Sequence, residues 1–193
     1  MFLDKIAKLV SIILGPHTWS ILLFIIVVLN TGLTNEQLAV VLPSVLLLQV
    51  AIPVSYLLFA PRLGWIKKWD MESKKERWPF LLLILVTYLI SLLIIYVYGN
   101  ILLFHLSIII IFLIITLFII TFKWKVSLHT SLNTMAALSI NFLFDWNLPL
   151  LYLTIPVIFW ARLRLKKHTV SQLIMGIVVT TMVLLGGLAL FGY

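Results

Sequence analysis

The feature that most constrains the fold of this 193-residue chain is a series of long apolar runs separated by short turn-like segments. A membrane-spanning helix needs about 20 apolar residues, and a mean hydropathy of +1.21 lies above the range of soluble domains. The sequence therefore predicts an all-α fold, a polytopic transmembrane helical bundle of six to seven membrane segments in one domain over residues 1–193. The runs cover residues 18–31, 37–60, 79–98, 101–122, 129–144, 148–161 and 170–191.

Residues 1–15 precede the first run and have the pattern of an amphipathic helix. Leu3, Ile6, Val10 and Ile13 recur at helical spacing, with Asp4, Lys5, Lys8 and Ser11 on the other side. This pattern predicts a helix at the membrane interface. The fifth and sixth runs are shorter than a full span, so we expect tilted or partly embedded helices there.

The positive charges follow a strict order along the chain. If each run crosses the membrane once, all 14 Lys and Arg residues fall on the side of the N-terminus. By the positive-inside rule this side is cytoplasmic, which predicts an integral protein of a prokaryotic cytoplasmic membrane. Because the cations lie in short loops between apolar runs, anionic lipid headgroups, and not nucleic acid, are the expected partners.

The chain has no cysteine. Disulfides, thiolate metal sites and a cysteine nucleophile are therefore excluded. Asp70, Glu72 and Glu76 are the candidates for a divalent metal, but neighbouring lysines are their more natural partners, so no metal and no cofactor are expected. The oligomeric state stays open.

If each run crosses the membrane once, three distant cationic segments also come to one membrane surface. They are residues 67–79, 123–130 and 162–172. Two of them add a histidine at the start of a predicted helix, His129 and His168. Guanidinium groups and helix N-termini both bind phosphate oxygens well. The alternative is a set of ordinary cytoplasmic anchoring charges.

Two histidines and an arginine suffice for covalent phosphoryl transfer. One histidine attacks phosphorus, the second protonates the leaving oxygen, and the arginine stabilises charge on the remaining oxygens. Arg162 precedes His168 by six positions, and Gln172 follows His168 by four. If a helix starts near His168, the Gln172 amide lies on its face and can orient the imidazole.

These segments resemble, in chain order, the three motifs of the type 2 phosphatidic acid phosphatase superfamily, which includes vanadium haloperoxidases. Its motifs are Lys, six residues, Arg-Pro; then Pro-Ser-Gly-His; then Ser-Arg, five residues, His, three residues, Asp. The resemblance covers about residues 67–180, a phosphatase-like core similar to small prokaryotic members. The matching segments are Lys74-Lys75-Glu76-Arg77-Trp78-Pro79, Val126-Ser127-Leu128-His129, and Ala161-Arg162 followed by His168 and Gln172.

The resemblance implies a metal-independent lipid phosphatase, a phosphoric monoester or diphosphate hydrolase. It implies His168 as the nucleophile that becomes phosphohistidine and His129 as the general acid, with Gln172 at the position that orients the nucleophile. The implied phosphate-binding residues are Arg162, Ser127, Arg77, Lys74 and Lys75. Candidate substrates are phosphatidic acid, phosphatidylglycerol phosphate and polyprenyl diphosphates.

The chain departs from the family pattern at three points. Gln172 replaces an aspartate and cannot balance an imidazolium, Leu128 replaces a glycine, and position 70 holds Asp, so Lys68, Lys74 or Lys75 would serve the first motif. The alternatives are a catalytically weak or inactive member that binds or transports anionic phospholipid or polyprenyl phosphate, and a structural subunit. Many family members have outward-facing sites, whereas the charge pattern predicts a cytoplasmic one.

Overall fold

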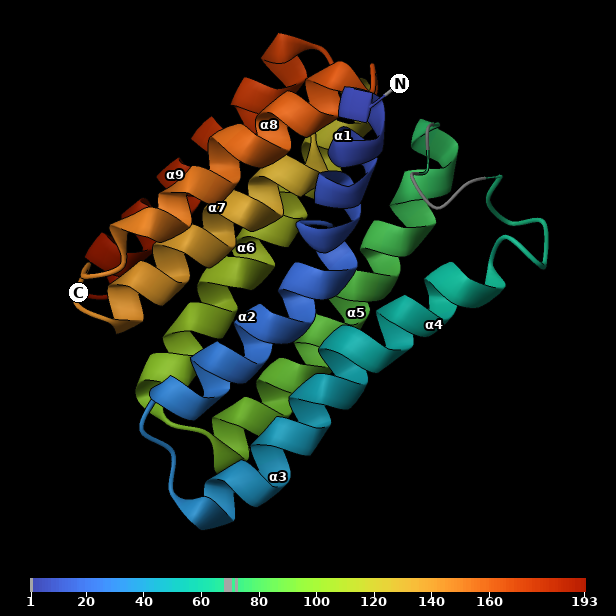
Figure 1. The fold of residues 1–193 in the computed structure, drawn as a ribbon. Coiled ribbons are helices and arrows are strands. Elements are labelled where there is room, and N and C mark those ends of the chain that lie inside the picture. The colour runs from blue at the N-terminus through green and yellow to red at the C-terminus, as the bar shows by residue number, and fades with distance from the viewer. Residues whose placement is uncertain (1, 68–70, 72) are drawn as a thin grey trace. The chain divides into compact units, whose positions relative to one another are not determined.

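A computed structural model describes residues 2–67, 71 and 73–193, without the side chains of Pro16, His17 and Lys74 (Figure 1). Every regular element in these residues is helical, as the apolar pattern predicts. The α-helices are α1 (Phe2–Ile13), α2 (Pro16–Asn30), α3 (Asn35–Val45), α4 (Ile52–Phe59), α5 (Lys74–Tyr98), α6 (Ile101–Lys123), α7 (Leu128–Leu143), α8 (Thr154–Arg164) and α9 (Val170–Leu190). A π-helical segment, η1 (Leu46–Ala51), joins α3 to α4, and a 3₁₀ turn, η2 (Pro149–Leu153), precedes α8.

Within the described residues, five stretches are long and apolar enough to cross a membrane. α7, with 16 residues, and α8, with 11, are shorter than a span of about 20 residues. The chain is therefore an all-helical membrane protein. The five stretches are Phe2–Asn30, Asn35–Phe59, Lys75–Tyr98, Ile101–Lys123 and Val170–Leu190.

The first stretch contains two helices, because the backbone is interrupted between α1 and α2. α1 ends at Ile13, and α2 begins at Pro16, whose missing N–H suits the first turn of a helix. A Cβ atom on Gly15 would lie 2.8 Å from the Ser11 carbonyl oxygen, so the turn needs glycine. Residues 2–13 of the amphipathic segment thus form a helix of their own, and one apolar stretch runs through both helices.

The helices form two compact units. The terminal unit comprises Met1–Val27 and Val126–Tyr193, and the central unit comprises Val28–Lys125. The prediction of one domain over residues 1–193 stays a prediction, because two units can belong to one membrane domain.

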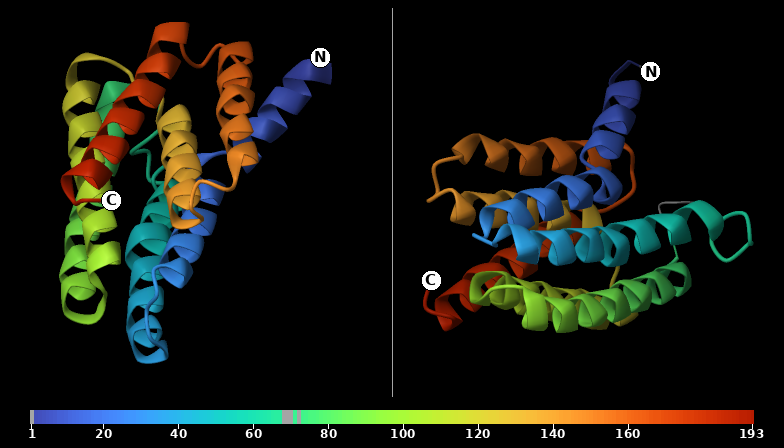
Figure 2. Two further views of the ribbon diagram at one scale, coloured as in Figure 1. Left: turned by 90° about the vertical axis from the view of Figure 1, so that its left-hand side faces the viewer. Right: turned by 90° about the horizontal axis from the view of Figure 1, so that it is seen from below.

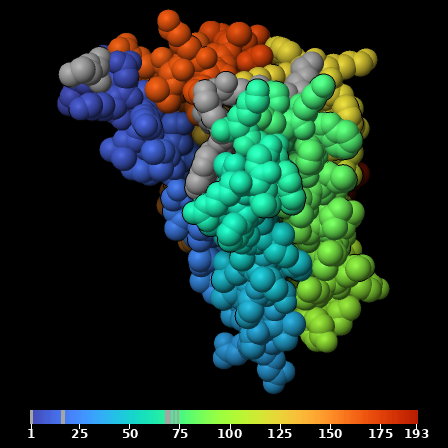
Figure 3. Space-filling model, turned by 90° about the vertical axis from the view of Figure 1, so that its right-hand side faces the viewer, coloured from blue at the N-terminus to red at the C-terminus, as the bar shows by residue number. Residues whose placement is uncertain are grey.

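In the central unit, α5 and α6 are antiparallel neighbours joined by Gly99 and Asn100 (Figure 2). The Asn100 side chain caps α6, and the Gln37 side chain at the start of α3 donates to the Gly99 carbonyl at 3.1 Å. The loop after α4 lies against the start of α5 (Figure 3), where Ile66 and Met71 pack with Phe80.

The π-helical segment has a local cause. Pro53 has no N–H, so the preceding turn cannot form its full set of i to i−4 bonds. The Ile52 N–H donates instead to the Leu47 carbonyl, five residues back. In this segment the buried Gln49 side chain donates to the Ser91 hydroxyl of α5 at 2.8 Å.

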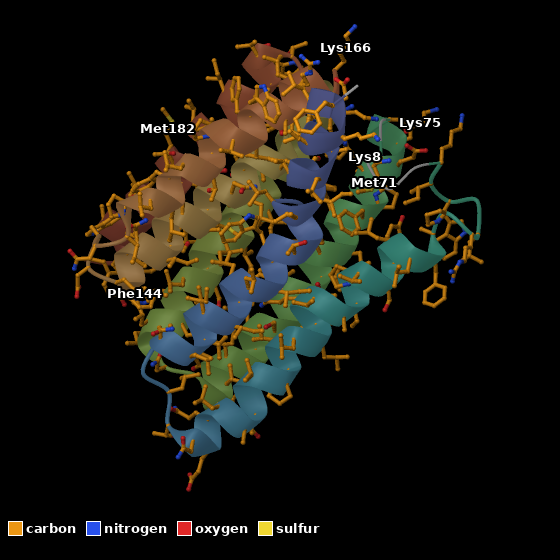
Figure 4. All side chains as sticks on the ribbon, in the orientation of Figure 1. Lys8, Met71, Lys75, Phe144, Lys166 and Met182 are labelled. Atoms are coloured by element: carbon orange, nitrogen blue, oxygen red, sulfur yellow. The ribbon has the colours of Figure 1, made fainter. Side chains whose placement is uncertain are left out.

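In the terminal unit, α7 packs against both α8 and α9, and α1 packs against α8. Arg164 is at the end of α8, Lys166 and Lys167 lie between it and the beginning of α9, and the beginning of α9 is bonded to that of α7. In Figure 4, Lys8 and Lys166 lie toward this end, and Phe144 lies at the other end of α7. The candidate site residues of this unit lie at the cationic end.

Candidate functional site

Helices α7 and α9 start side by side and run in the same direction. The Ser127 N–H donates to the Gln172 carbonyl (N···O 3.2 Å). One turn further on, the Thr130 hydroxyl donates to the Leu173 carbonyl at 3.1 Å, and the Ser131 hydroxyl donates to the Gly176 carbonyl at 3.3 Å. These contacts tie the first turn of α7, which carries His129, to the first two turns of α9, which begins two residues after His168.

Gly176 is the reason that α9 can approach α7 so closely. A Cβ atom at this position would lie 2.5 Å from the Thr130 hydroxyl oxygen and 2.8 Å from the Ser127 carbonyl oxygen. Small residues at helix contacts are typical of membrane proteins, because they let two backbones approach and form hydrogen bonds across the interface.

His168 lies two residues before α9, and its ring is held by Gln172. The distance between His168 Nδ1 and Gln172 Oε1 is 3.3 Å, and His168 is buried. The contact that the spacing predicts is therefore present, but it crosses the helix N-cap, because α9 begins only at Val170.

The orientation of the Gln172 amide follows from a capping box. Thr169 is the N-cap of α9, and its hydroxyl accepts the Gln172 N–H while its own N–H donates to Gln172 Oε1 at 3.1 Å. Because this atom accepts a backbone N–H, it is the amide oxygen. A hydrogen on His168 Nδ1 suits this contact, and in that tautomer of the neutral ring the lone pair is on Nε2.

Arg162 lies at the end of α8, six residues before His168. Its side chain is 3% exposed, and its Nη1 donates to the Ser11 hydroxyl of α1 at 2.9 Å. The Lys167 N–H donates to the Arg162 carbonyl at 3.1 Å across a turn in which Lys166 has a φ of 53°. This turn closes the end of α8 directly before His168 in the chain.

His129 is the second residue of α7 and is partly buried. Its carbonyl accepts a hydrogen bond from the Asn133 side-chain amide at 2.8 Å, and the same amide nitrogen donates to the Leu14 carbonyl at 2.8 Å. Asn133 is fully buried. It therefore links the turn that carries His129 to the end of α1.

Ser127 has a clear structural role. It is fully buried, and its hydroxyl accepts the Thr130 N–H at 3.4 Å as the N-cap of α7. The hydroxyl hydrogen is the part of this side chain left to donate to a phosphate oxygen, so the predicted phosphate contact stays a prediction.

The candidate residues of the first motif belong to the central unit. Arg77 is buried in the first turn of α5, and its Nε donates to the Met71 carbonyl at 2.9 Å, which holds the preceding loop. Lys75 is exposed, the side chain of Lys74 is outside the described part, and Lys68 is outside the described residues. The structure thus brings five predicted site residues into the terminal unit, and the three of the first motif into the other unit.

Two contributors escaped the sequence prediction. Ser11 lies on the polar side of the predicted interfacial helix, and the structure buries it against α8 beside Arg162, whereas Lys5 and Lys8 are exposed. The pattern of residues 1–15 does not show which of its polar side chains has a protein partner. Asn133 gave a signal in the unusually polar start of the fifth apolar run, but its partner on α1 is 119 residues away.

In chemical terms, the cationic end of the terminal unit offers an imidazole that is held through Nδ1, a second imidazole at a neighbouring helix start and a buried guanidinium. The N-termini of α7 and α9 add positive dipole ends, and such ends bind anions. Among the described residues, no three His, Asp or Glu side chains form a group that would hold a metal ion. This combination favours an anionic oxygen group such as a phosphate.

Comparison of the chain with protein-family models, with curated proteins and with solved structures finds no match in any of the three. A function is therefore argued from the residues of the site.

Proposed function

We propose that this protein is a membrane-embedded lipid phosphate or diphosphate phosphatase that acts through a phosphohistidine at His168, in the manner of the type 2 phosphatidic acid phosphatase superfamily. The observation that carries the proposal is the contact between His168 Nδ1 and Gln172 Oε1 at 3.3 Å. This contact supports the tautomer with its hydrogen on Nδ1, in which Nε2 carries the lone pair that a nucleophile needs.

In the proposed reaction, His168 Nε2 attacks phosphorus and the bond to the leaving oxygen breaks. Protonated His129 gives its proton to that oxygen, and the lipid alcohol or monophosphate departs. Water then attacks the phosphohistidine while neutral His129 takes its proton, which releases inorganic phosphate and restores both histidines. Arg162 stabilises charge on the equatorial oxygens throughout.

A second candidate is a protein that binds or transports anionic phospholipid or polyprenyl phosphate without turnover. Gln172 favours it, because a neutral amide orients His168 but supplies no charge to balance the imidazolium. The cap contacts of Ser127 and Gln172 would be needed in both cases, since they hold α7 and α9 together.

Lipid substrates suit a site at the cationic end of a membrane protein, where a headgroup reaches polar residues while its tails stay in the bilayer. Phosphatidic acid, phosphatidylglycerol phosphate and polyprenyl diphosphates all fit this description. The proposal includes six to seven membrane segments, with α7 and α8 as a short pair, and a cationic end that faces the cytoplasm of a prokaryotic cell.

The test is phosphate release by purified protein in detergent with chelator present, from a panel of these lipids. We expect release that is lost in His168→Ala and is retained in His105→Ala, a control on α6 of the central unit. With p-nitrophenyl phosphate, whose leaving group needs no proton, His129→Ala should retain far more activity than His168→Ala.

Rapid quenching at alkaline pH should trap phosphate on His168 in the wild type. Lipid binding that depends on Arg162, with no release from any substrate and no trapped phosphate, would establish the second candidate instead. Absence of both binding and release would reject both.

A further inference from the structure

Helix α1 lies on α8 with two small side chains inward. Ala7 and Ser11 are buried, and Ala7 packs with Ile158 and Ala161 of α8. Phe2, Leu9 and Ile12 point outward and are more than half exposed. This is the arrangement of a membrane helix whose apolar face contacts lipid, and its small residues allow the close approach to α8.

Three polar contacts join α1 to the two helices that carry the candidate site. Arg162 Nη1 donates to the Ser11 hydroxyl at 2.9 Å, and Arg164 Nε donates to Asp4 Oδ1 at 3.0 Å. The Asn133 amide of α7 donates to the Leu14 carbonyl at 2.8 Å. α1 is therefore bonded to α8 beside Arg162 and to α7 one turn after His129.

The two contacts with α8 differ in burial, and this separates their roles. The Arg164 and Asp4 side chains are 39% and 50% exposed, so their pair contributes little beyond docking of the helix. Arg162 and Ser11 are buried, and a hydrogen bond to a charged group is stronger there. A fixed guanidinium also loses less rotamer freedom when it binds a phosphate with two parallel N–H groups.

We propose that α1 is a wall of the phosphate site and that Ser11 is a positioning residue, whose hydroxyl holds the Arg162 guanidinium ready for the phosphate oxygens. The inference rests on the proposed function, because it assigns Arg162 to phosphate. It adds a segment about 150 residues away in sequence, outside the resembling region 67–180.

The test measures KM and kcat for dioctanoyl phosphatidic acid in Ser11→Ala, Ser11→Thr and Asp4→Asn. We expect Ser11→Ala to raise KM about tenfold, the size of one lost hydrogen bond to a charged group, with kcat within about twofold. Ser11→Thr keeps a hydroxyl and should restore KM. Asp4→Asn weakens only docking and should leave KM unchanged, as should Ser44→Ala, whose hydroxyl bonds within α3 at 2.7 Å.

In the double variant Ser11→Ala/Arg162→Ala we expect no further rise over Arg162→Ala, because the hydroxyl acts only through the guanidinium. A KM for Ser11→Ala equal to the wild-type value, while Arg162→Ala loses binding, would overturn the role of Ser11 and leave the phosphatase intact. If the wild type binds the lipid without turnover, Kd replaces KM, and the Kd of each variant is compared with that of the wild type. If the wild type neither binds nor hydrolyses the lipid, the proposed function fails and the inference falls with it.

Discussion

Gln172 uses one oxygen for two purposes. Its Oε1 accepts the Thr169 N–H at the start of α9 and faces His168 Nδ1. Glutamine and glutamate are the usual residues at this position of a capping box. The residue that orients the proposed nucleophile is therefore also a residue that α9 needs for its own N-terminus, which is a structural reason for a glutamine at this position.

Substitutions of Gln172 should separate these two purposes. We expect Gln172→Ala to lower kcat about tenfold through the lost hydrogen bond to His168, and to cost about 1 kcal/mol of stability through the lost cap. Gln172→Glu keeps the cap and adds a carboxylate that stabilises the imidazolium. Its pH–rate profile should have an acid limb about one pH unit higher and a faster plateau.

Gln37 provides a matched control, because it occupies the same position in the capping box that begins α3. Gln37→Ala should lose a similar amount of stability and keep kcat. Equal losses of kcat in Gln37→Ala and Gln172→Ala, measured at the same temperature, would show that Gln172 acts through stability alone.

At the scale of single residues, the contact between His168 and Gln172 could be predicted from the sequence, because residues four positions apart are neighbours at a helix start. The contact between Arg162 and Ser11 could not be predicted in this way, because the two residues are 151 positions apart in the chain. The amphipathic pattern of residues 1–15 predicts a helix at the membrane interface, but it does not show that Ser11 and Asp4 of this helix bond to α8.

At the scale of elements, the packing of α7 on α9 depends on one glycine. Gly176→Ala places a methyl group against the Ser127 carbonyl and the Thr130 hydroxyl. We expect a loss of about 1–3 kcal/mol of stability from overpacking, measured as a lower midpoint of thermal unfolding in detergent. The rate of phosphate release should also fall at temperatures where the variant is still folded. A misplacement of about 1 Å at a catalytic group can lower the rate about a hundredfold.

Gly186→Ala is the control on the same helix, since a Cβ atom there meets nothing within 4 Å. Its unfolding midpoint should correspond to a change of less than about 0.5 kcal/mol. If both glycine variants unfold at the same temperature and keep full activity, the close contact of α7 and α9 is not needed for the site.

The helices themselves were largely predictable, because long apolar runs end at turn residues such as Gly99 and Asn100. The run 37–60 was predicted without its π-helical segment, although Pro53 is its cause. The pattern of apolar residues in a helix does not change when one backbone hydrogen bond is displaced, so it could not predict this segment. The packing of α1 on α8 was not predictable either, because exposed and buried faces of membrane helices are both apolar.

At the scale of the whole molecule, each unit has its cations at one end. In the central unit, for example, Lys67 and Lys75 lie near the start of α5 and Lys123 at the end of α6, whereas Glu36 lies in the first turn of α3, at the opposite end of the unit. In the terminal unit, Arg164 bonds to Asp4 of α1, while Asp145 follows the far end of α7. Each unit taken alone therefore has the polarity that the positive-inside rule requires.

Cysteine labelling can test the orientation, because the chain has no cysteine and each introduced one is alone. Suitable exposed positions are Lys5 and Lys75 at the cationic ends, and Asn147 and Glu36 at the opposite ends. In intact cells a membrane-impermeant maleimide should label Asn147→Cys and Glu36→Cys at once, whereas Lys5→Cys and Lys75→Cys should react only after permeabilisation.

Reaction of both cationic positions in intact cells would place the proposed site outside the cell, where the substrate pool is the outer leaflet. Reaction of one but not the other would mean that the cationic ends of the two units face opposite sides, and Arg77 would then be excluded from a phosphate site shared with His168.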